Sequence, residues 1–133
     1  MKFKSLMVIK SIVCLCFAPV LLFLPEQLMN LLDLTSGSGT VLTAREYGAA
    51  LAGNFLLTWF ARNAEVSFTR LAIVLNLFVY DAIALAATLI LQLSGVLNLL
   101  GWGIVLIYLY FSVGFGYLFF KERVLVRYTA KTT

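Results

Sequence analysis

The residues of this chain best suited to chemistry are a few charged side chains set in apolar surroundings. Arg45 and Glu46 lie near the start of TAREYGAALAGNFLLTWFAR, residues 43–62, and Asp81 stands alone inside a longer apolar stretch. Together they could form an acid–base pair or hold a polar ligand. A lone carboxylate in hydrocarbon costs about 2.5–3.5 kcal/mol on an insertion scale, so Asp81 is expected to have a partner.

The rest of the chain offers little for catalysis. It contains no histidine, which excludes His-ligated haem and zinc, Ser–His triads and most general-base chemistry at neutral pH. Cys14 and Cys16 would point about 200° apart on a helix, so we expect buried apolar thiols and no shared metal or disulfide. We predict no metal site and no cofactor. An enzyme would have to rely on Asp81, Glu46 and the tyrosines, so a non-enzyme is the favoured reading.

The composition of the chain indicates a membrane protein. Of 133 residues, 62% are hydrophobic and 12% charged, whereas a soluble domain is about half apolar and about a quarter charged. So small a globule could not bury this much apolar surface. We predict an all-α membrane protein with one domain, residues 1–133, folded as a four-transmembrane-helix bundle. The predicted spans are about 5–24, 44–62, 67–92 and 96–120, followed by a basic cytoplasmic tail, 121–133.

The basic residues predict the direction of the spans. With the N-terminus inside, nine of the ten Lys and Arg residues fall on the inner side and only Arg45 falls outside, which is a strong positive-inside pattern. The inner set is Lys2, Lys4, Lys10, Arg62, Arg70, Lys121, Arg123, Arg127 and Lys131. Lys10 is expected to reach the inner interface with its long side chain. Both termini are therefore predicted to be cytoplasmic, and no nucleic-acid surface is expected.

The first outer loop predicts a short helix. In LPEQLMNLLDL, Pro25 suits the first turn and Glu26 complements the positive end of a helix. One apolar side, formed by Leu28, Met29, Leu31 and Leu32, would lie in the outer membrane interface. The segment TSGSGT, residues 35–40, is predicted to be a flexible link.

The start of the second span suggests both a cap and an ion pair. Thr43 and Glu46 have the spacing of a capping box. Arg45 stands at the wrong end of the helix dipole for a cation, so it calls for a carboxylate partner. Because only a short loop joins the second and third spans, Arg45 would lie within reach of Asp81, directly or through water. Two alternatives are a neutral, hydrogen-bonded Asp81 and an open aqueous pocket.

Small and polar residues mark helix contacts in the predicted bundle. Small residues at four-residue spacing in the second span predict close approach to the third span. Ala44, Gly48 and Ala52 form one such series, and Ala49 and Gly53 form another. Other polar side chains have two readings, as contacts between helices or as the lining of a small pocket in the outer half. These residues are Tyr47, Asn54, Asn76, Tyr80, Thr88, Tyr108 and Ser112.

Three stretches of the chain carry a resemblance. LFLPEQLMNLL, AREYGAALAGNFLLTWFAR and LGWGIVLIYLYFSVGFGYLFF resemble small four-helix bacterial membrane proteins related to the DoxX-like group. The shared features are the proline-led interfacial segment and an Arg-x-x-Gly start of the second helix, here Arg45 and Gly48. The resemblance implies a four-helix bundle in the bacterial inner membrane and, for some relatives, quinone or thiol redox chemistry. This chain lacks histidine and a CxxC motif, so we do not expect a redox activity.

Three functions follow as expectations. The first is a structural or accessory role, in which the protein packs in the lipid bilayer against another membrane protein or against itself. The alternative is a binder or carrier of a small lipophilic or weakly polar molecule in the outer-half pocket. A lipid- or quinone-linked enzyme is the least expected of the three.

Overall fold

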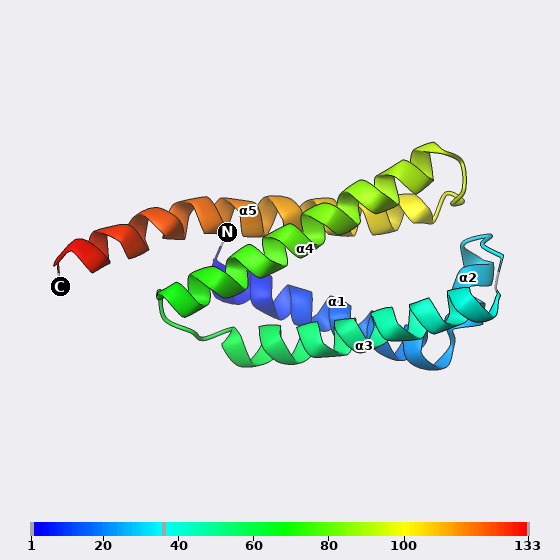
Figure 1. Cartoon of the computed structure of the whole chain (residues 1–133), viewed down its shortest axis with the longest axis horizontal. Helices are drawn as coiled ribbons and strands as arrows, with labels where there is room; N and C mark the ends of the chain where they lie inside the picture. The colour runs from blue at the N-terminus through cyan, green and yellow to red at the C-terminus, as the bar shows by residue number, and fades with distance from the viewer. Residues whose placement is uncertain (1, 36, 133) are drawn as a thin grey trace.

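The computed structural model describes residues 2–35 and 37–132, with side chains placed up to Arg127, and this part of the chain is helical without strands. The all-α prediction is therefore confirmed. The helices are α1 (Phe3–Phe23), α2 (Pro25–Leu31), α3 (Ser38–Ala61), α4 (Phe68–Leu93) and α5 (Gly101–Thr132). Figure 1 shows the long helices lying side by side, with α2 at one end of the molecule.

The long helices form two pairs. α1 packs along α3 and α4 packs along α5, whereas α3 and α4 diverge from the turn that joins them (Figure 1). We call the end that carries α2 and the α4–α5 turn the α2 end. The opposite end, where α4 begins, is the Arg70 end.

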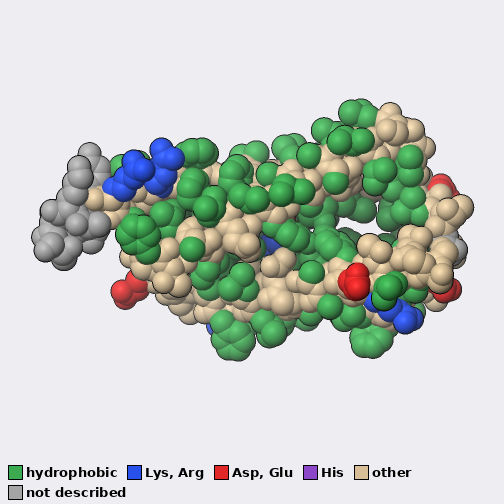
Figure 2. Space-filling view, in the orientation of Figure 1, with side chains coloured by type: hydrophobic (Ala, Val, Ile, Leu, Met, Phe, Trp, Pro, Cys, Tyr) green, Lys and Arg blue, Asp and Glu red, His purple; other side chains and the backbone are tan. Residues whose placement is uncertain are grey.

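Three helices, α1, α4 and α5, are long and apolar enough to cross a membrane, and they indicate a membrane protein. With 21 residues, α1 is about 31 Å long at about 1.5 Å per residue, close to the thickness of a bilayer core. Figure 2 shows hydrophobic side chains along much of the visible face and charged side chains toward its two ends. In lipid, a helix satisfies its own backbone polar groups, which favours this architecture.

The buried core differs between the two ends. Toward the Arg70 end, one apolar cluster joins α1, α4 and α5 and so ties the two helix pairs together; it contains Phe3, Leu6, Met7, Val74, Leu77, Phe111, Phe115 and Leu118. Toward the α2 end, a second cluster is confined to α1, α2 and α3; it contains Cys14, Ala18, Leu21, Met29, Ala44 and Leu51. The two pairs are therefore packed together at one end and less so at the other.

The turns have clear sequence causes. α2 begins at Pro25, with Glu26 in its first turn, in the region where a short helix was predicted. α4 ends at Leu93 and is capped by Ser94, and the next residue, Gly95, has a φ of 72°. The amide of Gly95 donates to Gln92 O (3.2 Å) and that of Val96 donates to Leu91 O (3.2 Å). This is a Schellman motif, in which glycine adopts the left-handed conformation without a steric penalty.

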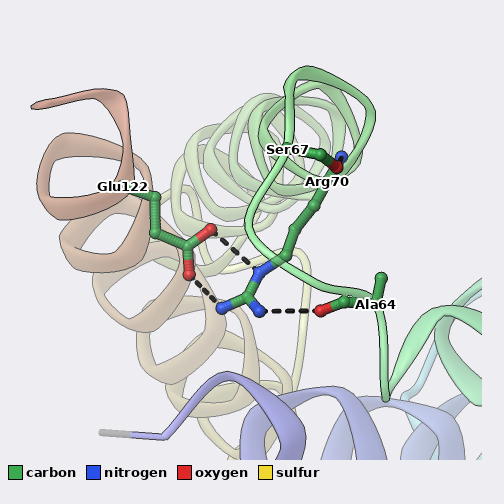
Figure 3. A network of polar contacts seen from close by, with 4 residues as sticks. All are labelled: Ala64, Ser67, Arg70 and Glu122. Atoms are coloured by element: carbon green, nitrogen blue, oxygen red, sulfur yellow. Dashed lines mark hydrogen bonds and ion pairs between the residues drawn. The ribbon is translucent and has the colours of Figure 1, made fainter. Parts of the chain in front are cut away.

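A polar cluster fastens the Arg70 end. The Arg70 guanidinium contacts both carboxylate oxygens of Glu122, with Nε 3.0 Å from Oε2, and donates from Nη1 to the carbonyl oxygen of Ala64 at 2.8 Å (Figure 3). It also lies 3.7 Å from the ring centroid of Phe3. Ser67 caps α4 by accepting a hydrogen bond from the amide of Arg70 (3.2 Å). One arginine thus links α1, α4, α5 and the α3–α4 turn.

Two predicted boundaries are corrected. α3 begins at Ser38, so part of the predicted flexible link, residues 38–40, is its first turn. The predicted soluble tail after residue 120 continues α5 as a helix. Glu122 and Val126 are buried in this extension, and the Arg70–Glu122 pair gives it a reason to stay helical.

Candidate functional site

The main candidate site is a cavity between the two helix pairs. It has a volume of about 510 Å³ and is lined by residues from all five helices. Figure 2 shows the molecule hollowed between the pairs toward the α2 end. Most of the wall is apolar; its polar side chains are Lys10, Thr40, Thr43, Tyr47, Thr88 and Tyr108. The cavity exists because the second core cluster leaves α4 and α5 out.

One of the lining residues, Lys10, belongs to a buried ion pair whose other member, Asp81, lies behind the cavity lining. The ammonium of Lys10 on α1 donates a hydrogen bond to Oδ1 of Asp81 on α4, and both side chains are almost fully buried. Two rings flank the ammonium, with ring centroids 4.5 Å (Phe111) and 5.4 Å (Tyr80) from Nζ. Within the described residues, Oδ2 of Asp81 has no hydrogen-bond partner. The pair is thus a neutral unit with unused hydrogen-bonding capacity.

The partner predicted for Asp81 was wrong. Arg45 is exposed on α3, and Asp81 is paired with Lys10 instead. The prediction assumed that the short turn after Ala61 makes α3 and α4 neighbours along their length. In the structure α3 packs on α1, and the long side chain of Lys10 on α1 reaches Asp81 instead.

The position of Lys10 follows from the helical periodicity of α1. Its buried residues are Phe3, Leu6, Met7, Lys10, Ser11, Cys14, Ala18 and Leu21. These recur at three- and four-residue intervals, so they share one face of the helix. Lys10 lies on that face and points into the bundle rather than toward the interface. This spacing was the available signal, and the expectation of a snorkelling lysine overlooked it.

Two tyrosines connect α3 and α5 across the cavity. The hydroxyls of Tyr47 and Tyr108 are hydrogen bonded to each other, and both residues line the cavity. Thr88 on α4 lines it as well. The structure therefore brings these three residues of the predicted pocket to one space.

The other residues of the predicted pocket are outside the cavity lining, although Tyr80 is next to two lining residues, Lys10 and Tyr47. Tyr80 is half-buried on α4 beside Lys10, and Ser112 is buried on α5. Asn54 is half-buried, and its backbone carbonyl accepts a hydrogen bond from Thr58 at 2.7 Å. Asn76 is exposed on α4. None of these four residues lines the cavity.

The predicted capping box is also wrong. Because α3 begins at Ser38, Thr43 lies inside the helix, and its hydroxyl donates to the carbonyl oxygen of Gly39 (3.0 Å). Glu46 is exposed on the same helix. Neither residue is placed to cap the first amides of α3.

The small residues of α3 serve a different contact from the one predicted. Ala44 and Gly48 are buried against α1, where a Cβ atom added to Gly48 would lie 3.0 Å from Leu21 Cβ. Ala52 packs against the same cluster of α1, α2 and α3 residues. Gly53 faces open space. The close approach is therefore to the first long helix, not the third.

A second polar contact that sequence reasoning missed joins α1 and α3. The hydroxyls of Ser11 and Thr58 lie 2.8 Å apart, and both residues are buried.

The two cysteines lie in different surroundings: Cys14 is buried and lines the cavity, whereas Cys16 is exposed. Within residues 2–35 and 37–127, no three His, Cys, Asp or Glu side chains are grouped to hold a metal ion.

Comparison with protein-family models, with curated proteins and with solved structures gives no match for this chain. The arrangement of the site is therefore interpreted from its chemistry. It combines a mainly apolar cavity with a hydroxyl pair in its wall and with Lys10, which is paired with the buried Asp81. Such a site suits binding of a lipophilic molecule better than bond-making chemistry.

Proposed function

We propose that the protein binds a small lipophilic molecule within the membrane, in the cavity between its two helix pairs. The proposal rests mainly on the cavity of about 510 Å³ with its largely apolar wall. Ligand pockets usually have volumes of about 300–1,000 Å³, apolar walls and a few placed polar groups. Lys10, Tyr47 and Tyr108 supply such groups here.

We further propose that α3 is a fourth span. Phe3 of α1 and Arg70 of α4 meet at the Arg70 end, so both helices start there and run parallel. If both cross the membrane, the intervening chain must return across it. α3 has 24 residues, about 36 Å at about 1.5 Å per residue, and α1 lies along it. Its hydropathy is lowered by Arg45, Glu46 and Asn54.

The charges support an orientation with the Arg70 end in the cytoplasm. Once Lys10 is assigned to the bundle interior, eight of the ten basic residues remain on that side and Arg45 alone lies opposite. This distribution favours cytoplasmic termini in a bacterial inner membrane. α2 would then lie at the outer interface, with Met29 and Leu32 directed inward.

Ligand binding can be tested with a variant in which a larger side chain fills the cavity. Ala84→Phe places a ring in the cavity wall, and Ala86→Phe, on an exposed position of the same helix, is the matched control. Wild-type and variant proteins would be purified in mild detergent and their bound molecules identified by mass spectrometry. A stoichiometric lipophile retained by wild type and Ala86→Phe, and lost from Ala84→Phe, is expected. Equal retention by all three would refute the proposal.

A structural role is the second candidate, favoured by the surface of α3. Its side away from α1 exposes Leu56 (53%) and Phe60 (77%), and a Cβ at Gly53 would meet nothing within 4 Å. Small and large apolar residues side by side suit packing against another membrane protein or a second copy. Cysteines placed at Gly53 would cross-link two copies if they form that contact, and would not if α3 faces lipid.

The likeness to DoxX-like proteins stays a proposal about ancestry and architecture. It rests on the proline-led α2 and on Arg45 and Gly48 of α3. No redox activity is proposed for this chain, because neither histidine nor a CxxC motif is present.

A further inference from the structure

We infer that the ligand of the cavity is a neutral lipophile whose head carries an oxygen acceptor, such as an ester or carbonyl, and not a charged amphiphile. The inference rests on the proposed function and adds the chemical class of the ligand. Three features carry it: the charge balance at the cavity wall, the supply of hydrogen-bond donors there, and the apolar lining of the remainder.

The charge balance excludes a charged head. Lys10 and Asp81 compensate each other, and both are almost fully buried. A permanent anion beside Lys10 would leave the buried group with a net negative charge, and a cation beside Asp81 would leave it positive. In a water-poor site an uncompensated charge is expensive, because the remaining groups do not replace its hydration. A neutral head avoids this cost.

The donors at the wall select an acceptor. An ammonium has three N–H donors, and among the described residues Asp81 is its one hydrogen-bond acceptor. The Phe111 and Tyr80 rings attract the ammonium through their faces, and the Tyr80 hydroxyl makes no hydrogen bond among the described residues. In the Tyr47–Tyr108 pair, one hydroxyl proton serves the bond between them. The other can go to an oxygen of the ligand or to the buried Tyr80 hydroxyl, which interacts with Tyr47 and has no hydrogen-bond partner among the described residues. A carbonyl oxygen on the ligand could accept hydrogen bonds from both the Lys10 ammonium and a tyrosine hydroxyl.

The apolar lining determines the rest of the molecule. Beyond Lys10 and the tyrosines, the cavity runs toward the α2 end between residues such as Phe17, Leu21, Leu51 and Ile104. This wall favours a hydrocarbon chain or an isoprenoid tail. The ligand is therefore expected to lie with its head near Lys10 and its tail toward α2.

The test compares four probes that share a hexadecyl-length chain. Methyl palmitate has a neutral acceptor head, hexadecane has no head, hexadecyl sulfate is a permanent anion and hexadecyltrimethylammonium is a permanent cation. Saturable binding of each radiolabelled probe would be measured on purified protein in nanodiscs, with empty nanodiscs subtracted. Methyl palmitate should bind about tenfold or more tightly than hexadecane, as a hydrogen bond to a charged donor would allow. The two ions should bind more weakly than methyl palmitate.

A double variant identifies the group responsible. The double variant Lys10→Met with Asp81→Leu removes both charges, so no buried charge is left without a partner. Its binding of methyl palmitate should fall to about the level of hexadecane, while hexadecane still binds, which shows that the cavity is intact. Tightest binding of the sulfate, or equal binding of methyl palmitate and hexadecane by wild type, would overturn this inference alone. No saturable binding of any probe, with Ala84→Phe indistinguishable from wild type, would overturn the proposed function with it.

Discussion

Lys10 on α1 is hydrogen bonded to Asp81 on α4, and the lysine of this buried ion pair lines the cavity where the two helix pairs cease to share a core. On the Arg70 side of the pair, apolar residues of α1, α4 and α5 are packed together. On the α2 side, the second core belongs to α1, α2 and α3 alone. The pair thus joins the two halves of the bundle beside the space that we assign to a ligand.

The ion pair predicts a characteristic pattern of stabilities. Lys10→Met or Asp81→Leu alone leaves one buried charge without its partner, and each should lower the free energy of unfolding by about 3–5 kcal/mol. The double variant should lose less than either single one. Lys4→Met, at an exposed position of α1, is the control and should be nearly neutral. Unfolding in mixed detergent micelles would measure these changes, and additive losses would contradict a coupled pair.

The cluster at the Arg70 end predicts that geometry matters there as well as charge. Arg70→Lys keeps the charge but loses the two-pronged contact with Glu122 and the bond to Ala64. We expect a loss of about 1.5–3 kcal/mol in unfolding free energy. Arg127→Lys, at an exposed position of α5, should change little. If both variants unfold alike, Arg70 does not fasten this end.

The packing of α1 on α3 predicts opposite outcomes at two glycines. A side chain at Gly48 would meet Leu21, Leu22 and the carbonyl oxygen of Ala18, whose atoms lie 3.0–3.1 Å from a Cβ at that position. Gly48→Leu should therefore destabilise the protein by about 1–3 kcal/mol or more, through overpacking. Gly53→Leu should be tolerated, because nothing lies within 4 Å of its Cβ position. Thermal unfolding followed by size-exclusion chromatography would separate them, and equal tolerance would argue against this helix contact.

The proposed orientation predicts which turns are accessible from outside the cell. With Cys14 and Cys16 replaced by alanine, Thr35→Cys before α3 should react with a membrane-impermeant maleimide in intact cells. Glu65→Cys, in the turn before α4, should react only after permeabilisation. Both positions are exposed in the structure, so burial does not explain a difference. Labelling of Glu65→Cys in intact cells would contradict the four-span arrangement or its direction.

The sequence predicted the helical class and several helix bounds because these depend on local composition. α4 covers Phe68–Leu93 where 67–92 was predicted, since a long apolar run marks this helix in the chain. The short helix after Pro25 was readable for the same reason. The start of α3 was missed because Gly37 supplies no side-chain cap to mark it.

The partners of the polar residues depend on which helices are neighbours, and local pattern does not determine this. Asp81 has a basic partner, Lys10, whereas Arg45 was chosen in the prediction because its helix is adjacent in the chain. The short α3–α4 turn brings only the joined ends of these helices together, and further along the bundle it is Lys10 of α1 that reaches Asp81. The Arg70–Glu122 contact was missed because Glu122 was assigned to a soluble tail.

Occupation of the cavity can be tested most directly by photolabelling. A methyl ester with a hexadecyl-length chain bearing a diazirine would be irradiated with the protein in nanodiscs, and the modified residues mapped by mass spectrometry. We predict labelling of Val13, Phe17 and Leu21, which line the cavity, and its suppression by excess methyl palmitate. Labelling of Ile12 and Leu15, on the exposed side of the same helix, should not be suppressed. Labelling confined to Ile12 and Leu15, or labelling of all five residues without competition, would contradict a ligand-binding cavity.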